Sequence, residues 1–147
     1  METAALIVAI VALAVSLSAF VFELISRRRQ LLLTIYDKLL ETEQQRGRRL
    51  VYELAESGTS YESLDESSRD CVNHALSTLN VLGFLYERRY VPRHDSLLLW
   101  GPAASRARRS AQICGFLDYW DKKSEGPVAP YLRKFAAAAE SIDNRSS

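Results

Sequence analysis

The side chains best suited to nucleophilic or metal chemistry are few and lie far apart along the chain. Cys71 and Cys114 each fall within an apolar helical pattern, where a thiol behaves as a small hydrophobic group. His74 and His94 are equally isolated, and the chain has no Cys-x-x-Cys or His-Glu-x-x-His spacing for a metal ion. We therefore expect no metal site, no cofactor and cysteines that stay reduced.

Basic residues form two clusters that could bind nucleic acid or phosphate. Arginine and tyrosine interleave in residues 86–90, and Arg106, Arg108 and Arg109 follow later in the chain. The first cluster ends a predicted helix, where arginines complement the helix dipole, and the second spreads over a solvated helix face. The chain has 19 Lys and Arg against 18 Asp and Glu, and the two signs balance after Arg29. This neutrality gives no electrostatic case for nucleic acid.

Acidic residues near the second tryptophan are the remaining candidates for catalysis. Asp118, Asp121 and Glu125 flank Trp120, but neither their spacing nor any neighbouring nucleophile suggests an acid–base reaction. We therefore expect that the protein is not an enzyme.

The strongest pattern is an apolar run at the N-terminus, from Ala4 to Ile25, whose single charge is Glu23. As a helix rising ~1.5 Å per residue it is about 33 Å long, enough to cross a ~30 Å hydrocarbon core. Arg27, Arg28 and Arg29 follow at once, and arginine-rich flanks stay on the cytoplasmic side. We expect a single-pass protein of the plasma (inner) membrane, with its N-terminus outside and its main domain in the cytosol.

A cleaved secretory signal is the alternative to a permanent anchor. Residues 12–14 (Ala-Leu-Ala) and 16–18 (Ser-Leu-Ser) resemble small-residue cleavage sites. Against a signal, the residues before the run include no Lys or Arg, and the run continues well past both sites.

Small residues recur along one face of the apolar run. Their spacing of four and three residues places them in a heptad stripe: Ala5, Ala9, Ala12, Ser16 and Ala19. Small side chains let helix backbones approach closely in lipid, so the stripe is a candidate packing seam for a homo-oligomer. The abundance of alanine in the run explains the stripe equally well. Glu23 precedes Arg27 by four residues, which predicts an i,i+4 ion pair.

Helical periodicity dominates the rest of the chain, and no stretch alternates as a strand would. We expect the first helix to run without interruption to Gly58, and Ser63 with Glu66 to form a capping box for the next. The apolar face of that helix comprises Val72, Ala75, Leu76, Leu79, Leu82 and Tyr86.

Proline and glycine divide the second half of the domain. Residues 91–92 (Val-Pro) end the core helix, Asp95 caps a short turn, and residues 101–102 (Gly-Pro) restart or kink a helix towards Trp120. Its predicted apolar face is Ala107, Ala111, Cys114 and Leu117. Pro130 precedes a last helix whose apolar residues are Tyr131, Leu132, Phe135 and Ile142.

These elements predict an all-α protein with three parts. Residues 1–29 form a transmembrane anchor with an arginine stop, residues 30–142 a cytosolic bundle of about four helices, and residues 143–147 a disordered tail. Within the bundle, Leu97, Leu98, Leu99 and Trp100 are four consecutive apolar residues that cannot all face one core. They are either a buried hinge or a docking surface.

The order of these elements resembles a bacterial family of small membrane-anchored helical proteins, known as a domain of unknown function. The resemblance rests on the membrane helix, the core segment 79–85, the turn near Pro92 and the helix ending at Trp120. It covers most of the chain after Leu31 and implies architecture only, because that family has no assigned catalytic residue.

The sequence therefore predicts an interaction or scaffolding protein whose membrane helix sets its location. Its expected partners are the lipid bilayer, a second copy of itself and an unidentified cytosolic protein. The alternative is a stress or defence effector, in which the bundle senses a signal and assembled membrane helices alter permeability.

Overall fold

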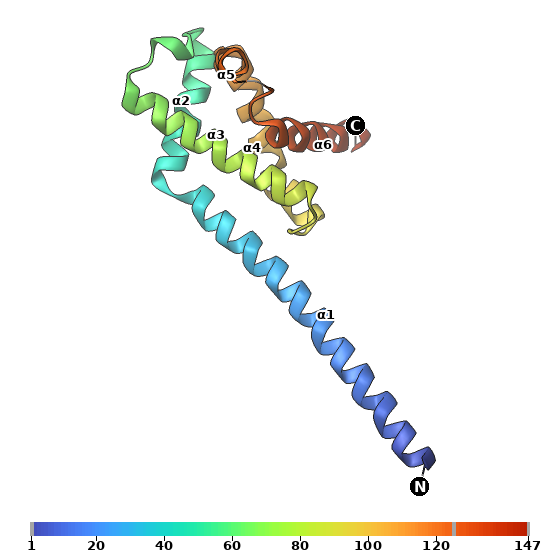
Figure 1. The fold of residues 1–147 in the computed structure, drawn as a ribbon. Helices are drawn as coiled ribbons and strands as arrows, with labels where there is room; N and C mark the ends of the chain where they lie inside the picture. Colours follow the sequence, from blue (N-terminus) through green and yellow to red (C-terminus); the bar gives the residue numbers. More distant parts are fainter. Residues whose placement is uncertain (1, 125, 147) are drawn as a thin grey trace.

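The computed structural model describes residues 2–124 and 126–146, and these residues are helical with no strand (Figure 1). Met1, Glu125 and Ser147 lie outside the described residues. The elements are α1 (Glu2–Leu40), α2 (Thr42–Ser57), a 3-10 helix (Tyr61–Ser63), α3 (Glu66–Glu87), α4 (Arg93–Ile113), α5 (Phe116–Lys123) and α6 (Pro130–Ser146). The prediction of an all-α chain with a long apolar N-terminal helix followed by a bundle is confirmed.

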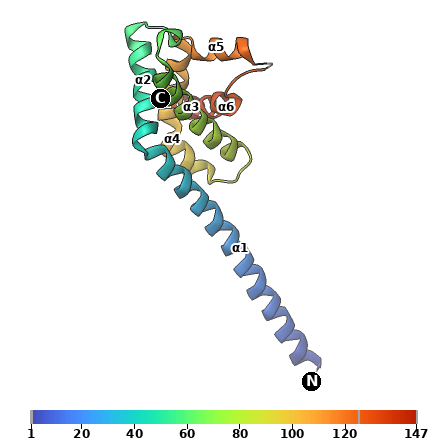
Figure 2. The same ribbon diagram turned by 60° about the vertical axis from the view of Figure 1, so that its left-hand side comes forward.

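Helix α1 has two parts with different surroundings. Its first part projects from the bundle as a rod, and every residue from Thr3 to Ile25 is exposed (Figures 1 and 2). This part is long and apolar enough to cross a membrane. In the second part Leu32, Ile35 and Leu39 are buried against the bundle. The same helix therefore supplies both the candidate anchor and part of the core.

The prediction of one unbroken helix up to Gly58 is wrong, because the chain bends at Glu41. Glu41 has an extended backbone (φ −54°, ψ 143°) between α1 and α2. The carbonyls at the end of α1 find side-chain donors in α2: Arg48 Nη2 donates to the Leu39 carbonyl at 2.9 Å, and Gln45 Nε2 to the Leu40 carbonyl at 2.7 Å. Gly58 does end α2, with the left-handed φ of 68° that favours glycine.

Helix α3 is the central core helix, and the face predicted for it is buried. The predicted capping box is not its N-terminus, however. Asp65 caps α3 by accepting the Ser68 N–H at Oδ2 (3.2 Å), while Ser63 belongs to the preceding 3-10 helix. A carboxylate one residue before the helix satisfies an orphan amide and favours the positive end of the dipole.

Glycines allow close helix crossings on two sides of α3. A Cβ on Gly47 of α2 would lie 2.7 Å from the Cβ of Ala75, and one on Gly83 would lie 2.6 Å from the carbonyl carbon of Tyr131 in α6. Near the second crossing, Asn80 Oδ1 accepts the N–H groups of Tyr131 and Leu132, each at 3.0 Å. These amides belong to the first turn of α6 and have no intrahelical partner. Asn80 therefore caps α6 from a neighbouring helix.

Helix α4 passes through Gly101 and Pro102 as one helix, so the restart that was one of the two expectations here is wrong. Proline removes one backbone hydrogen bond, to the carbonyl of Leu98 four residues earlier, but tertiary contacts hold the helix on both sides. Trp100 is buried, and Gly101 lets α6 approach so closely that an added Cβ would lie 2.9 Å from that of Ala139. The break falls later, at Gly115 (φ 78°), which separates α5 from α4.

The connection between α5 and α6 is held by one carboxylate. Asp121 accepts the Val128 N–H at Oδ1 and Arg133 Nη2 at Oδ2, both at 2.6 Å. The hydrogen bond from Val128, together with the guanidinium of Arg133, lowers the pKa of Asp121. Helix α6 starts at Pro130 as predicted and buries Leu132 and Phe135, whereas Ile142 is exposed. The described backbone of α6 continues to Ser146, Ser147 lies outside the described residues, and the disordered tail at residues 143–147 stays a prediction.

Candidate interaction surfaces

The four apolar residues of α4 separate into core and surface. Trp100 is buried, with its ring edge-on to Tyr36 of α1 at 5.5 Å between centroids, and Leu97 is half-buried. Leu98 and Leu99 are 69% and 51% exposed. The segment is therefore neither wholly a buried hinge nor wholly a surface: Trp100 fixes α1 to the bundle, while Leu98 and Leu99 remain at the surface.

A groove of about 530 Å³ lies between α4 and α6, next to Leu98. Its apolar wall is formed by Leu97, Leu98, Pro102, Ala139 and Ile142. The close crossing at Gly101 and a hydrogen bond from Ser105 Oγ to the Ala136 carbonyl (3.2 Å) hold the two helices that form the groove. The groove is thus built on rigid elements rather than on a loop.

The rim of this groove is basic. His94, Arg106 and Arg109 line it, with Glu140 as its one acidic residue among the described ones. Arg106 Nη2 pairs with Glu56 at 3.2 Å, so the excess positive charge comes from Arg108 and Arg109, which share the Glu140 carboxylate. Glu140 Oε1 lies 3.5 Å from Arg108 Nη1 and 3.9 Å from Arg109 Nη2, so its charge is already compensated. Apolar walls with a positive rim suit an amphipathic segment that carries acidic residues.

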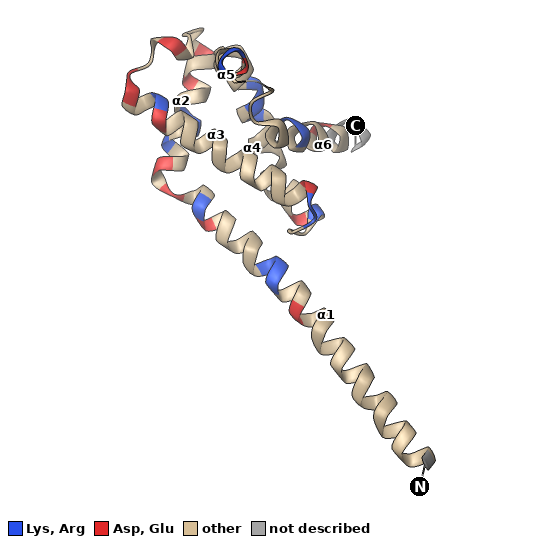
Figure 3. Cartoon of the chain, in the orientation of Figure 1, with Lys and Arg blue, Asp and Glu red and all other residues tan. Residues whose placement is uncertain are grey.

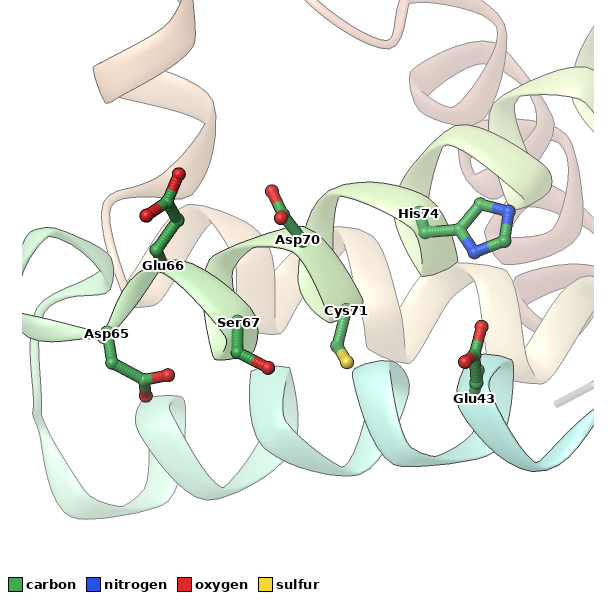
Figure 4. A pocket seen from close by; sticks show the side chains of 7 residues that line it. All are labelled: Glu43, Asp65, Glu66, Ser67, Asp70, Cys71 and His74. Carbon is green, nitrogen blue, oxygen red and sulfur yellow. The ribbon is translucent and has the colours of Figure 1, made fainter.

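A second hollow, of about 830 Å³, lies between α2 and α3 and is acidic (Figure 4). Its lining residues are Glu43, Asp65, Glu66, Ser67, Asp70, Cys71 and His74. Glu43 of α2 points towards His74 of α3, whereas Glu66 and Asp70 point away from α2 (Figure 4). In the part of the chain that is described, no three His, Cys, Asp or Glu side chains are placed to hold a metal ion.

The junction of α1, α2 and α4 contains polar groups that the sequence did not mark as buried. Gln44 is fully buried and Arg48 is 8% exposed, with its guanidinium carbon 5.4 Å above the Trp100 ring. Among the described residues, the Gln44 amide and Trp100 Nε1 have no hydrogen-bond partner. Burial lowers the pKa of Arg48. Gln44 and Arg48 lie on the same face of α2 as the buried residues Val51 and Leu54, and this helical spacing was the signal in the sequence for their burial.

The candidate anchor residues lie on the exposed part of α1. Arg27 pairs with Glu23 at 2.6 Å, which confirms the predicted i,i+4 ion pair. Arg28 and Arg29 are exposed beside it, and from Thr3 to Phe22 the helix carries no charged residue, which Figure 3 shows as an unbroken tan stretch of α1. The small residues of the stripe are all exposed, as a packing seam requires: Ala5, Ala9, Ala12, Ser16 and Ala19.

The two cysteines occupy different environments. Cys114 is buried at the end of α4, where burial raises the pKa of its thiol, and Cys71 is partly exposed in the acidic hollow. A raised pKa keeps a thiol protonated and a poor nucleophile. Cys114 therefore acts as a small core residue.

Comparisons of the chain with protein-family models, with curated proteins and with solved structures find no match. The resemblance to small membrane-anchored bacterial proteins therefore stays a prediction.

Proposed function

We propose that this protein is a single-pass membrane-anchored interaction module rather than an enzyme. In this proposal α1 crosses the plasma membrane over residues 4–25, the bundle lies in the cytosol, and the groove between α4 and α6 binds a partner protein. The observation that carries it is the exposure of α1. Every side chain from Thr3 to Ile25 is exposed, although the bundle closes a complete core around α3. Such a long apolar surface is stable in lipid and costly in water.

The arginines support the proposed orientation. Arg27, Arg28 and Arg29 follow the apolar part directly, and positive residues next to a span favour the cytoplasmic side. A reporter that is active only in the cytosol should work when fused after Ser147, and a reporter that requires export should not. Replacing the three arginines by glutamine should scramble this result. Export of the fused reporter in the native sequence would refute the orientation.

The groove supports a partner of defined chemistry. Its apolar wall and basic rim fit an amphipathic helix with acidic residues beside its apolar face. Leu98→Asp places a charge on the wall and should release a protein that co-purifies with the full chain in lipid nanodiscs. Ile113→Asp is the matched control, because Ile113 is also an exposed apolar residue of α4 but lies outside the groove. Equal loss with both variants would refute the groove as the binding site.

A further inference from the structure

The turn between α3 and α4, residues 88–92, forms the end of the bundle nearest to the apolar part of α1 (Figures 1 and 2). The bundle also begins close to the arginine triplet, because Leu32 is already buried against it. Leu32 lies three residues after Arg29, about 5 Å along a helix. If α1 spans a bilayer as proposed, the turn therefore lies near the lipid headgroups.

The side chains of this turn carry positive charge and aromatic surface. Arg88 and Arg89 are exposed at the end of α3, Tyr90 is 51% exposed, and Arg93 is exposed at the start of α4. Basic and tyrosine side chains together are typical of a membrane–water interface, where cations meet phosphates and the ring lies among headgroups.

The acidic residues nearby leave an excess of positive charge. Glu87 forms an ion pair with Lys134 of α6 at 3.3 Å, so these two charges cancel. Asp95, in the first turn of α4, contributes one negative charge, compared with the three positive charges of Arg88, Arg89 and Arg93. Figure 3 shows basic and acidic residues meeting at this end of the bundle. The turn and the arginine triplet thus present positive charge on the same side of the bundle.

Arg89 occupies a backbone position that favours glycine. Its φ is 59°, the Arg89 N–H donates to the Tyr86 carbonyl (3.1 Å), and the Tyr90 N–H donates to the Leu85 carbonyl (2.9 Å). These bonds form a Schellman motif, whose left-handed residue is usually glycine. At two other helix ends the chain does use glycine in this conformation, at Gly58 and Gly115. A side chain is less favourable than glycine in this conformation, and among the described residues Ala129 (φ 51°) is the other non-glycine residue that adopts it.

We propose that the α3–α4 turn is a second membrane contact, which binds the anionic headgroups of the leaflet that α1 enters. This inference rests on the proposed membrane anchor and adds to it the lipid class and the site. Arg88, Arg89 and Arg93 bind the lipid phosphates, and Tyr90 inserts among the headgroups. The contact holds the bundle at a fixed angle to the bilayer, and so fixes how the α4–α6 groove faces the cytosol.

The test measures the distance of the turn from the lipid headgroups in the full chain. A spin label is attached at His94→Cys, with Cys71→Ser and Cys114→Ala as background, and the protein is placed in nanodiscs of phosphatidylcholine with or without phosphatidylglycerol. A nickel chelate on a lipid headgroup then raises the relaxation rate of the spin label, and the rate rises further as the label comes closer to the headgroups. A label at Thr59→Cys, in the turn after α2, is the distant control. A label at Ala12→Cys, with oxygen as the relaxing agent, reports whether α1 lies in hydrocarbon.

We expect strong relaxation at position 94, weak relaxation at 59, and an increase at 94 when phosphatidylglycerol is present. Arg88→Gln with Arg89→Gly should shift the equilibrium away from contact by roughly 30-fold, because each arginine near an anionic leaflet contributes about 1 kcal/mol of attraction. The glycine preserves the left-handed cap, so loss of folding does not explain the shift. Arg46→Gln with Arg49→Gln removes the same charge from the exposed side of α2 and should have little effect.

Three results would overturn the inference: equal relaxation at positions 94 and 59, no response to phosphatidylglycerol, or equal effects of the two double substitutions. If position 12 lies in hydrocarbon, these results leave the anchor intact and remove only the second contact. The basic turn would then be assigned to an acidic protein partner. If position 12 is exposed to water, the anchor and this inference both fail.

Discussion

Replacing Gly83 by alanine should force α3 and α6 apart. The new Cβ would lie 2.6 Å from the carbonyl carbon of Tyr131, whereas ordinary contacts begin at 3.4 Å. The obstacle is backbone, and α6 is also fixed at this point by the two amides that donate to Asn80. The backbone of α6 cannot move away from the new Cβ as a flexible side chain could, so the two helices must separate.

The cost of this separation exceeds the gain from a better helix former. Overpacking against rigid neighbours costs up to about 3 kcal/mol, and alanine in place of helical glycine recovers about 1 kcal/mol. The expected net loss is about 2 kcal/mol in the free energy of unfolding, or roughly 8 °C or more in Tm for a domain of this size. Ser77→Ala is the matched control, because Ser77 is exposed on the same helix and should give a small gain.

Thermal unfolding of the full chain in micelles, followed by tryptophan fluorescence, measures this loss. Trp100 and Trp120 both lie in the bundle, so their signal is separate from the helicity of the exposed apolar part of α1. A Tm for Gly83→Ala equal to or above that of the native sequence would refute the close crossing of α3 and α6. The same result with a raised Tm for Ser77→Ala would show that helix propensity alone governs both positions.

Three further predictions address charge, association and folding. The pKa of Asp121 is lowered in the folded state, so its ionised carboxylate stabilises the fold above the unfolded pKa of about 3.9, and this stabilisation is lost as pH falls. Asp121→Asn should therefore make the free energy of unfolding fall less steeply below about pH 4. Denaturant titration at several pH values measures this. Ala12→Leu should reduce crosslinking between copies if the small residues form a packing seam, whereas Val11→Leu, which lies off the stripe, should not. Equal crosslinking of the two variants would also remove the main support for the effector alternative. A chain beginning at Gln30 keeps the part of α1 that packs in the core, so it should be helical by circular dichroism and melt cooperatively, and a gradual melt would mean that the anchor completes the core.

Helical periodicity and several helix ends could be read correctly before any contact was known, although the capping residue of α3 could not. The buried face of α3, the stop at Gly58 and the start of α6 at Pro130 depend on residues within one or two turns of each other. The ion pair between Glu23 and Arg27 is equally local. Each of these features follows from helix geometry and from backbone preferences, which the neighbouring residues already specify.

Contacts between distant segments decided the rest. The bend at Glu41 depends on Arg48 reaching the end of α1, and α4 continues through Pro102 because Trp100 and Gly101 pack against α1 and α6. The surface followed the same rule, since Leu98 lines a groove only because α6 lies beside it. Burial of Gln44 likewise depends on which helices cross α2. The linear pattern specifies which face of a helix is apolar, but only the packed bundle specifies what that face meets.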